Sequence, residues 1–538
     1  MARLPPRRPT LSCVTGPETP ILREHLLIVA LLLVLAACSS PSADRPQNGS
    51  VASAGTVTES VADSTTASPT TAPPAGIDAA DGIGDSFYID LGNAGYDVQN
   101  VSLTLSMDPS VPTLEGTSVL TALATEDLDS FTLDFDELEV GSVAVDGMPA
   151  EFDHQMGELR IDPDAVIPNG TEFEVAVAYG GSPVPFTSQG APFATGMLNV
   201  NGALFALSEP DGTSSWMPVN DHPLDKATYR IQVTVPNPLV VASIGTLVST
   251  ELVDEDTTTY TWESRDPVAP YLLPLAVGDF LIEEEVGPNG VPIRNYFDDD
   301  IPAASLTSFR RQGEMLAYLT EIYGPYPFEA YGALVVDTIN LGAALETQTL
   351  STFGRQSLPA GETVIVHELA HQWFGNSVSV ADWSDIWLNE GFATYTQWLW
   401  LEHQGQIEEF DAEIAFAYDL MSGGVFLDTA ADAEAARAEA QASFPPPGQP
   451  EPSDLFNGSV YLRGGLTLHA LRLEIGDEAF FDTLRAYADR YAYGNARTAE
   501  FIAVAEEQSG RELGGFFDAW LYDAEIPPIP ELGLEPPR

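Results

Sequence analysis

The chain changes its hydrophobic pattern near residue 290. Before that point, short stretches alternate between apolar and polar residues and are separated by Gly, Pro, Asn and Asp, for example residues 101–107, 131–135, 173–179 and 229–235. Alternation with a period of two predicts strands with one buried face. We therefore expect an antiparallel β-sandwich domain over residues 84–288.

After residue 290, apolar positions recur every three to four residues, which is the period of a helix. The pattern predicts helices at residues 303–323, 363–374, 386–403, 411–421, 460–475, 478–491, 498–508 and 513–522. One extended stretch, residues 333–337, lies among them. The fold class we expect is a multidomain α+β protein, in which the β-sandwich precedes a mostly helical domain at residues 289–530 and a short tail at 531–538.

The first 83 residues follow neither pattern. Arginines precede an apolar run at residues 26–37 that is too short for a membrane span of about 20 residues and fits a signal peptide at 1–37, unless the true start lies downstream of Met1. The sequence LAAC that ends at Cys38 matches the lipobox of secreted bacterial lipoproteins. Residues 38–83, rich in Ser, Thr, Ala and Pro, predict a disordered tether. We therefore expect an extracytoplasmic protein that is anchored to the membrane through a lipid on Cys38.

Charge excludes one class of partner. The chain has 80 acidic and 21 basic residues, a formal net charge of -59, and Lys226 is its one lysine. A polyphosphate would be repelled, so the chain is not a nucleic-acid binder. Apolar residues make up 44% of the chain, which distinguishes it from disordered acidic proteins. We expect a folded protein with an acidic surface.

The segment VIVHELAHQWFG at residues 364–375 carries candidate metal chemistry. His367 and His371 are four positions apart, so on a helix they share one face, as two ligands of one metal ion require. Glu368 beside them can take a proton from a metal-activated water and pass it to a leaving amine. Glu390, in WLNEGFATY, is available as a third ligand. Two imidazoles and one carboxylate are typical of catalytic zinc, so we expect one Zn²⁺ per chain; the alternative is a pair of structural helix histidines.

The sequence HELAHQWFG, followed by WLNEGFA, resembles the gluzincin zinc aminopeptidases, the family of aminopeptidase N and leukotriene hydrolase. The resemblance covers about residues 84–530 and implies a thermolysin-like fold for the helical domain. It implies a metallopeptidase that removes N-terminal residues from peptides, here in a bacterial lipoprotein form. Larger members carry a further helical domain, so the resemblance also implies a two-domain form with a more open cleft.

Three more residues take roles from this resemblance. Tyr461, in VYLRG, would hydrogen-bond the oxyanion of the tetrahedral intermediate. Glu346, in AALET, would receive the α-ammonium of the substrate, and Glu209, ahead of PVNDHP, would be a second carboxylate for that ammonium. The alternatives are a zinc endopeptidase, another zinc hydrolase on the same fold, or a non-catalytic surface binding module. The resemblance implies peptide substrates, and no oligomeric state follows from it.

Overall fold

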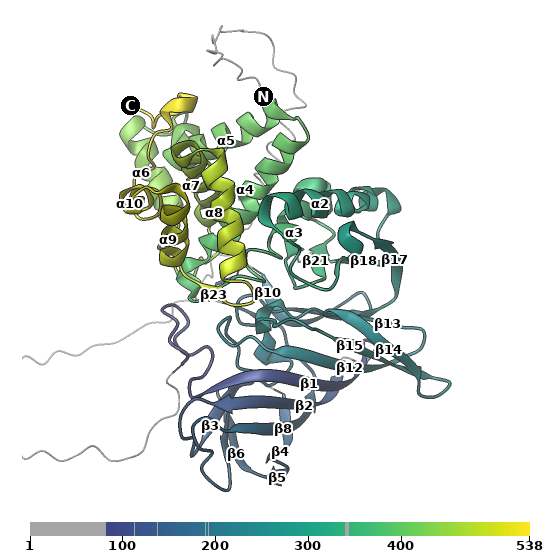
Figure 1. The fold of residues 1–538 in the computed structure, drawn as a ribbon. Coiled ribbons are helices and arrows are strands. Elements are labelled where there is room, and N and C mark those ends of the chain that lie inside the picture. Colours follow the sequence, from purple (N-terminus) through teal and green to yellow (C-terminus); the bar gives the residue numbers. More distant parts are fainter. Residues whose placement is uncertain (1–81, 112, 137, 189, 192, 339–343) are drawn as a thin grey trace, which may run out of the picture.

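The computed structural model describes residues 82–538, apart from positions 112, 137, 189, 192 and 339–343. The predicted signal peptide, Cys38 and all but the last two residues of the predicted tether lie outside the described residues. The chain forms a β-rich part, at the bottom of Figure 1, and a helical part above it. Within the described part of the chain, no helix has both the length and the apolar character that a bilayer crossing needs.

The described residues of the β-rich part form three sheets. The first has the order β14-β15-β12-β1-β2-β8-β4-β5 and contains β1 (Tyr96–Asp108), β2 (Thr113–Ala124), β4 (Glu139–Val145), β5 (Met148–Pro149), β8 (Glu172–Gly181), β12 (Thr228–Pro236), β14 (Thr246–Leu252) and β15 (Thr257–Glu263). The second has the order β13-β16-β11-β10-β9 and contains β9 (Phe186–Thr187), β10 (Ala194–Val200), β11 (Ala203–Leu207), β13 (Val240–Ser243) and β16 (Leu275–Gly278). The third contains β3 (Phe131–Asp134), β6 (Glu151–Gln155) and β7 (Glu158–Asp162).

The four alternating stretches named above all form strands, β1, β3, β8 and β12. In β12, Tyr229, Ile231, Val233 and Val235 are buried while their neighbours are partly exposed, which is the alternation that the sequence shows. One pairing differs from the purely antiparallel prediction, because β1 and β12 run parallel. These two strands are far apart in sequence, so no hairpin constrains their direction.

The helical part contains, after a 3-10 segment at Ala303–Arg311, the helices α2 (Gln312–Tyr323), α3 (Glu362–Ala370), α4 (Trp387–His403), α5 (Ile407–Ser422), α6 (Ala433–Ser443), α7 (Gly458–Ile475), α8 (Asp477–Arg490), α9 (Thr498–Ser509) and α10 (Gly514–Leu521). The sequence pattern does not predict α6, because its apolar residues are all alanines and make no strong apolar stripe. The side chain of Asp432 begins this helix by accepting a hydrogen bond from the backbone N–H of Ala435.

The second part contains a five-stranded sheet, of which the sequence predicted one strand: the extended stretch at residues 333–337 corresponds to β19, and the other four strands were not predicted. Its order is β17-β18-β19-β21-β20, with β17 (Phe280–Val286), β18 (Pro292–Asp298), β19 (Tyr331–Val336), β20 (Ala344–Leu345) and β21 (Ser351–Gly354). Every residue of β19 is buried, so this strand shows no alternation. The predicted domain boundary at 288/289 falls in the turn between β17 and β18, which pair with each other. A shorter sheet pairs β22 (Ser379–Val380) with β23 (Asn495–Ala496).

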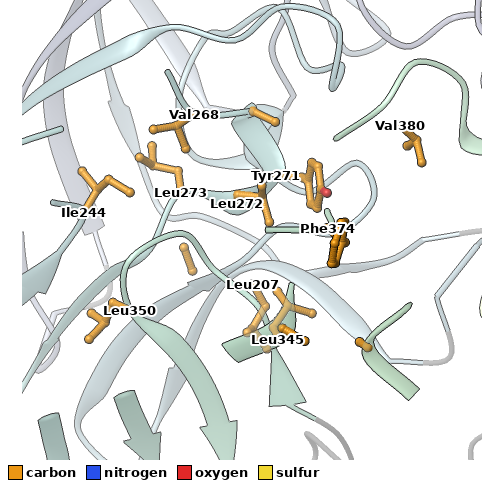
Figure 2. Packing of buried hydrophobic residues seen from close by; sticks show 14 of the residues in the cluster. Leu207, Ile244, Val268, Tyr271, Leu272, Leu273, Leu345, Leu350, Phe374 and Val380 are labelled. Carbon is orange, nitrogen blue, oxygen red and sulfur yellow. The ribbon is translucent and has the colours of Figure 1, made fainter. Parts of the chain in front are cut away.

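One buried apolar cluster contains side chains from both parts. Leu207, at the end of β11, and Tyr271 come from the β-rich part, whereas Leu345 of β20 and Phe374 come from the second part (Figure 2). Burial of apolar surface from both sides stabilises their contact. The ends of β11 and β20 are thereby held in one core.

Candidate active site

Two histidines lie at the carboxyl end of α3. His367 is in its last turn and His371 follows directly after it, and both rings are buried. The four-residue spacing places the ring centroids 4.8 Å apart. The Nδ1 of His371 donates a hydrogen bond to the carbonyl oxygen of Phe374 at 3.1 Å, which leaves its Nε2 as the free ligand atom.

Glu390, in the first turn of α4, faces both rings. Its Oε2 lies 3.3 Å from Nε2 of His367 and 3.6 Å from Nε2 of His371. Ligand atoms bound tetrahedrally to one zinc ion at about 2.0–2.1 Å lie about 3.3 Å from one another. The three side chains therefore fit a single zinc ion by both spacing and donor type.

The charges at this triad favour a cation. Burial alone would raise the pKa of Glu390, but His371 and His367 lower it to about 2. Burial also opposes the charged form of His371, yet the carboxylates of Glu346 and Glu390 raise its pKa to about 10. The protein groups alone therefore hold a carboxylate and a proton in a buried site, and a metal ion would take the place of that proton.

Glu368 lies beside the triad without belonging to it. One ligand atom each of Glu368, Glu346 and His371 lie within 4.8 Å of one another, and Glu368 is buried. Burial raises the pKa of Glu368 well above its usual value; His371 opposes this, while Glu346 and Glu390 add to it. A carboxylate with a raised pKa is suited to take up a proton and then return it.

Tyr461 approaches the triad from the first turns of α7. Its ring lies 6.2 Å from the ring of His367, centroid to centroid, and the two planes are nearly parallel at 19°. Burial, followed by the charges of Glu390 and the nearby carboxylates, raises the pKa of Tyr461 well above its usual value. Its hydroxyl therefore stays protonated and can donate a hydrogen bond.

Glu209 and Glu346 bring two more carboxylates to the site. Each is 2% exposed, and one oxygen atom from each, together with one from Glu390, lie within 4.8 Å of one another. One oxygen of each, Oε1, is buried with no hydrogen-bond partner among the described residues. Burial raises the pKa of Glu346, and burial with the neighbouring carboxylates raises that of Glu209. Nδ1 of His371 lies 3.9 Å from Oε1 of Glu346, beyond hydrogen-bond distance. Two buried carboxylates with oxygens that lack a hydrogen bond are costly unless a further cation binds between them.

Two amides that hold Glu346 were not singled out from the sequence. Its backbone carbonyl accepts a hydrogen bond from Nε2 of Gln372 at 3.0 Å and another from Nδ2 of Asn376 at 2.7 Å. Gln372 stands inside the HELAHQWFG segment and Asn376 directly after it. Their position next to the metal motif is the sequence feature that could have identified them. Thr347 serves the turn itself, since its hydroxyl donates to the carbonyl of Leu350 at 2.5 Å.

The structure brings together, from both parts of the chain, all seven predicted site residues that it describes; they are His367, Glu368, His371, Glu390, Tyr461, Glu346 and Glu209. Cys38, the predicted lipid acceptor, lies outside the described residues.

Comparison with known families matches both parts of the chain. The peptidase M1 N-terminal domain matches residues 94–272, and the peptidase family M1 domain matches residues 308–520. Curated relatives include "Aminopeptidase M1" of Arabidopsis thaliana, 27% identical over 60% of this chain, and human "Glutamyl aminopeptidase", 26% identical over 61% of it. These alignments cover 37% and 35% of the relatives, so the chain spans little more than a third of their length.

The alignment with one solved structure covers the whole length of that structure's chain. The M1 zinc metallopeptidase from Deinococcus radiodurans has a TM-score of 0.75 and 32% identity, and the alignment covers 85% of this chain and 100% of the other. A mutant of that metallopeptidase was crystallised with a Tyr-Ser-Ala substrate, and it matches with the same TM-score.

Proposed function

The chain belongs to peptidase family M1, and on this premise we propose that it is a zinc aminopeptidase, which removes residues one at a time from the amino ends of peptides. The observation that carries the proposal is the pair of buried carboxylates beside the metal triad, Glu209 and Glu346, each with an oxygen that has no hydrogen bond among the described residues. An enzyme that cleaves internal bonds has no cation to place there. The free amino terminus of a peptide supplies one.

Each residue takes a role that its position supports. His367, His371 and Glu390 would hold the zinc ion, which when bound polarises the scissile carbonyl and makes water acidic. Glu368 removes the proton of the attacking water and returns it to the leaving amine. Tyr461, whose ring lies 6.2 Å from that of His367, donates a hydrogen bond to the oxygen that becomes negative.

Specificity for the amino end follows from the cost of burying charge. Glu346 and Glu209 accept hydrogen bonds from the substrate ammonium, which satisfies oxygens that otherwise have no partner among the described residues. An internal peptide segment presents no positive charge, so it would leave these buried oxygens without a hydrogen bond. The related metallopeptidase crystallised with Tyr-Ser-Ala supports short peptides as the substrate class.

A peptide digest that is read by mass spectrometry tests this function. The proposal expects a ladder that shortens only from the amino end, the disappearance of that ladder with a zinc chelator, and its return with added zinc. Internal fragments as first products would instead favour a zinc endopeptidase. No cleavage of any peptide by zinc-loaded protein would favour another hydrolase or a surface binding module.

We also propose that the mature protein is a lipoprotein on the outer side of a cell membrane, attached through Cys38. The support is the apolar run at residues 26–37 and the lipobox that ends at Cys38. Replacement of Cys38 by Ser should move the protein from the membrane to the soluble fraction with unchanged specific activity, because the predicted tether at residues 38–83 precedes both family domains. Retention of the Cys38→Ser variant on membranes would contradict the lipid anchor.

A further inference from the structure

Lys226 is the one lysine among the 21 basic residues of the chain, and it is partly buried. It precedes β12 in the β-rich part, but its Nζ reaches the second part. There it donates to three backbone carbonyls, those of Asn376 at 2.9 Å, Ser377 at 3.1 Å and Gly494 at 2.8 Å.

This arrangement explains why the residue is a lysine. An ammonium carries three N–H donors around one nitrogen, and here each donor has its own carbonyl acceptor. An arginine carries its donors in a flat fork, which suits a carboxylate and does not suit three carbonyls that surround one point. Burial lowers the pKa of Lys226 to about 7, so the three carbonyls must compensate for a real cost.

The segment that Lys226 holds, residues 375–378, connects the metal helix to the amine-binding carboxylate. The backbone N–H of Asn376 donates to the carbonyl of His371 at 3.0 Å, which ties the segment to a metal ligand. The side-chain amide of Asn376 donates to the carbonyl of Glu346 at 2.7 Å. A shift of the segment would therefore move the backbone of Glu346 directly.

The two amine-binding carboxylates come from different parts of the chain. Glu209 follows β11 in the β-rich part, as Lys226 does further along, whereas Glu346 follows β20 in the second part. Both carboxylates must converge on one small ammonium, so the relative position of the two parts has to be fixed within a fraction of an ångström. A tie from the β-rich part to the segment that holds Glu346 meets this need.

We propose that Lys226 is a positioning residue for substrate recognition, which acts through Asn376 to hold Glu346 in place relative to Glu209. The proposal rests on the aminopeptidase function proposed above and assigns a residue that does not touch the substrate. Loss of this positioning role should weaken binding of the free amino terminus, while zinc binding and the rate of the chemical step are retained.

The test compares Lys226→Met, Asn376→Ala and the double variant with wild type. Lys226→Met keeps the length of the side chain and removes the ammonium. For a free-amine peptide we expect KM to rise about ten-fold while kcat changes less than about three-fold, and zinc content to stay at one per chain. The weak cleavage of the N-acetylated peptide should be unaffected. Asn376→Ala should act in the same direction, and the double variant should add little, because both changes break one connection.

Asn495→Ala is the matched control. The Asn495 amide joins the same two parts, through the carbonyls of Pro223 at 2.8 Å and Val380 at 3.0 Å, without reaching segment 375–378. It should lower the melting temperature slightly and leave KM unchanged.

An unchanged KM in both Lys226→Met and Asn376→Ala would overturn the positioning role, as would a loss of zinc from both. If Lys226→Met does not fold, Asn376→Ala decides alone, because it removes no charge. Failure of the proposed function is distinguishable, since wild-type protein would then cleave the free and the N-acetylated peptide equally well, as an endopeptidase does, or would cleave neither.

Discussion

Gly391 and Gly464 place the backbones of α4 and α7 in direct contact. A Cβ built on Gly464 would lie 2.8 Å from Cα of Gly391, and one on Gly391 would lie 2.9 Å from Cα of Gly464. Glu390 is the neighbour of the first glycine, and Tyr461 lies one helical turn before the second. The close crossing of the two helices therefore sets the spacing between Glu390, a candidate metal ligand, and Tyr461, the candidate oxyanion donor.

Replacing Gly464 by Ala should separate these helices, because the new methyl group meets backbone atoms that cannot turn away. We expect a loss of about 1–3 kcal/mol in the free energy of unfolding, and a fall in kcat of about ten-fold or more from misplacement of Tyr461. Gly514→Ala is the control, since no atom lies within 4 Å of the Cβ position there. Wild-type kcat in a folded Gly464→Ala variant would show that the crossing does not set the site geometry.

Replacing Glu368 by Gln should separate chemistry from metal binding. The three ligands are untouched, so zinc should stay bound at one per chain, whereas turnover should fall by about two orders of magnitude or more because the base is lost. Metal analysis and kcat on one preparation check both statements. Near-normal turnover would remove Glu368 from the mechanism.

Replacing Glu390 by Ala should instead lower the zinc content itself, because one of three protein ligands is lost. Glu402→Ala offers a control on the same helix, since Glu402 pairs with Arg472 at 2.8 Å and belongs to none of the carboxylate groups at the active site. Zinc should remain at full stoichiometry in the control. Full zinc in Glu390→Ala as well would assign the third ligand to another carboxylate.

A buried carboxyl in the β-rich part predicts a pH dependence of stability. Burial raises the pKa of Asp225 to about 8, although the backbone N–H of Val98 and the amide of Asn220 donate to it and oppose the rise. An unfolded aspartate has a pKa of about 3.9, so the folded state holds a proton that the unfolded state releases. The stability from this group is therefore complete below about pH 4 and is lost as the pH rises toward 8.

Thermal unfolding across pH 5–8 checks this sign. The melting temperature of wild type should fall more steeply with pH than that of Asp225→Asn, whose amide does not titrate. Parallel profiles would mean that Asp225 is ionised in the folded protein throughout this range.

The metal site could be predicted from the sequence because two of its ligands lie within one short segment. His367 and His371 share one helix, and their spacing alone implies a common ligand face. Glu346 and Glu209 follow separate strands in separate parts of the chain, so only resemblance to a known family indicated them, and the structure then brought them together. The fully buried β19 was only partly recognised, since a strand covered on both faces shows no alternation.

Contacts between distant segments could not be predicted from the sequence pattern either. Nothing in the sequence near Lys226 indicates that its ammonium donates to the carbonyls of Asn376 and Gly494. Every residue has a backbone carbonyl, so residue identity does not reveal which carbonyl will accept a hydrogen bond. The sequence showed only that the residue is unusual, as the one lysine in the chain.

The most direct test of the account compares wild type and Glu346→Gln on one peptide with a free and with an acetylated amino terminus. A charge pair broken inside a buried site costs about 3–5 kcal/mol, so kcat/KM for the free peptide should fall by about two orders of magnitude or more. The weak activity on the acetylated peptide should stay the same or rise, because no ammonium is present there. If both substrates lose the same factor, Glu346 does not read the amino terminus, and the account of this protein as an aminopeptidase is contradicted.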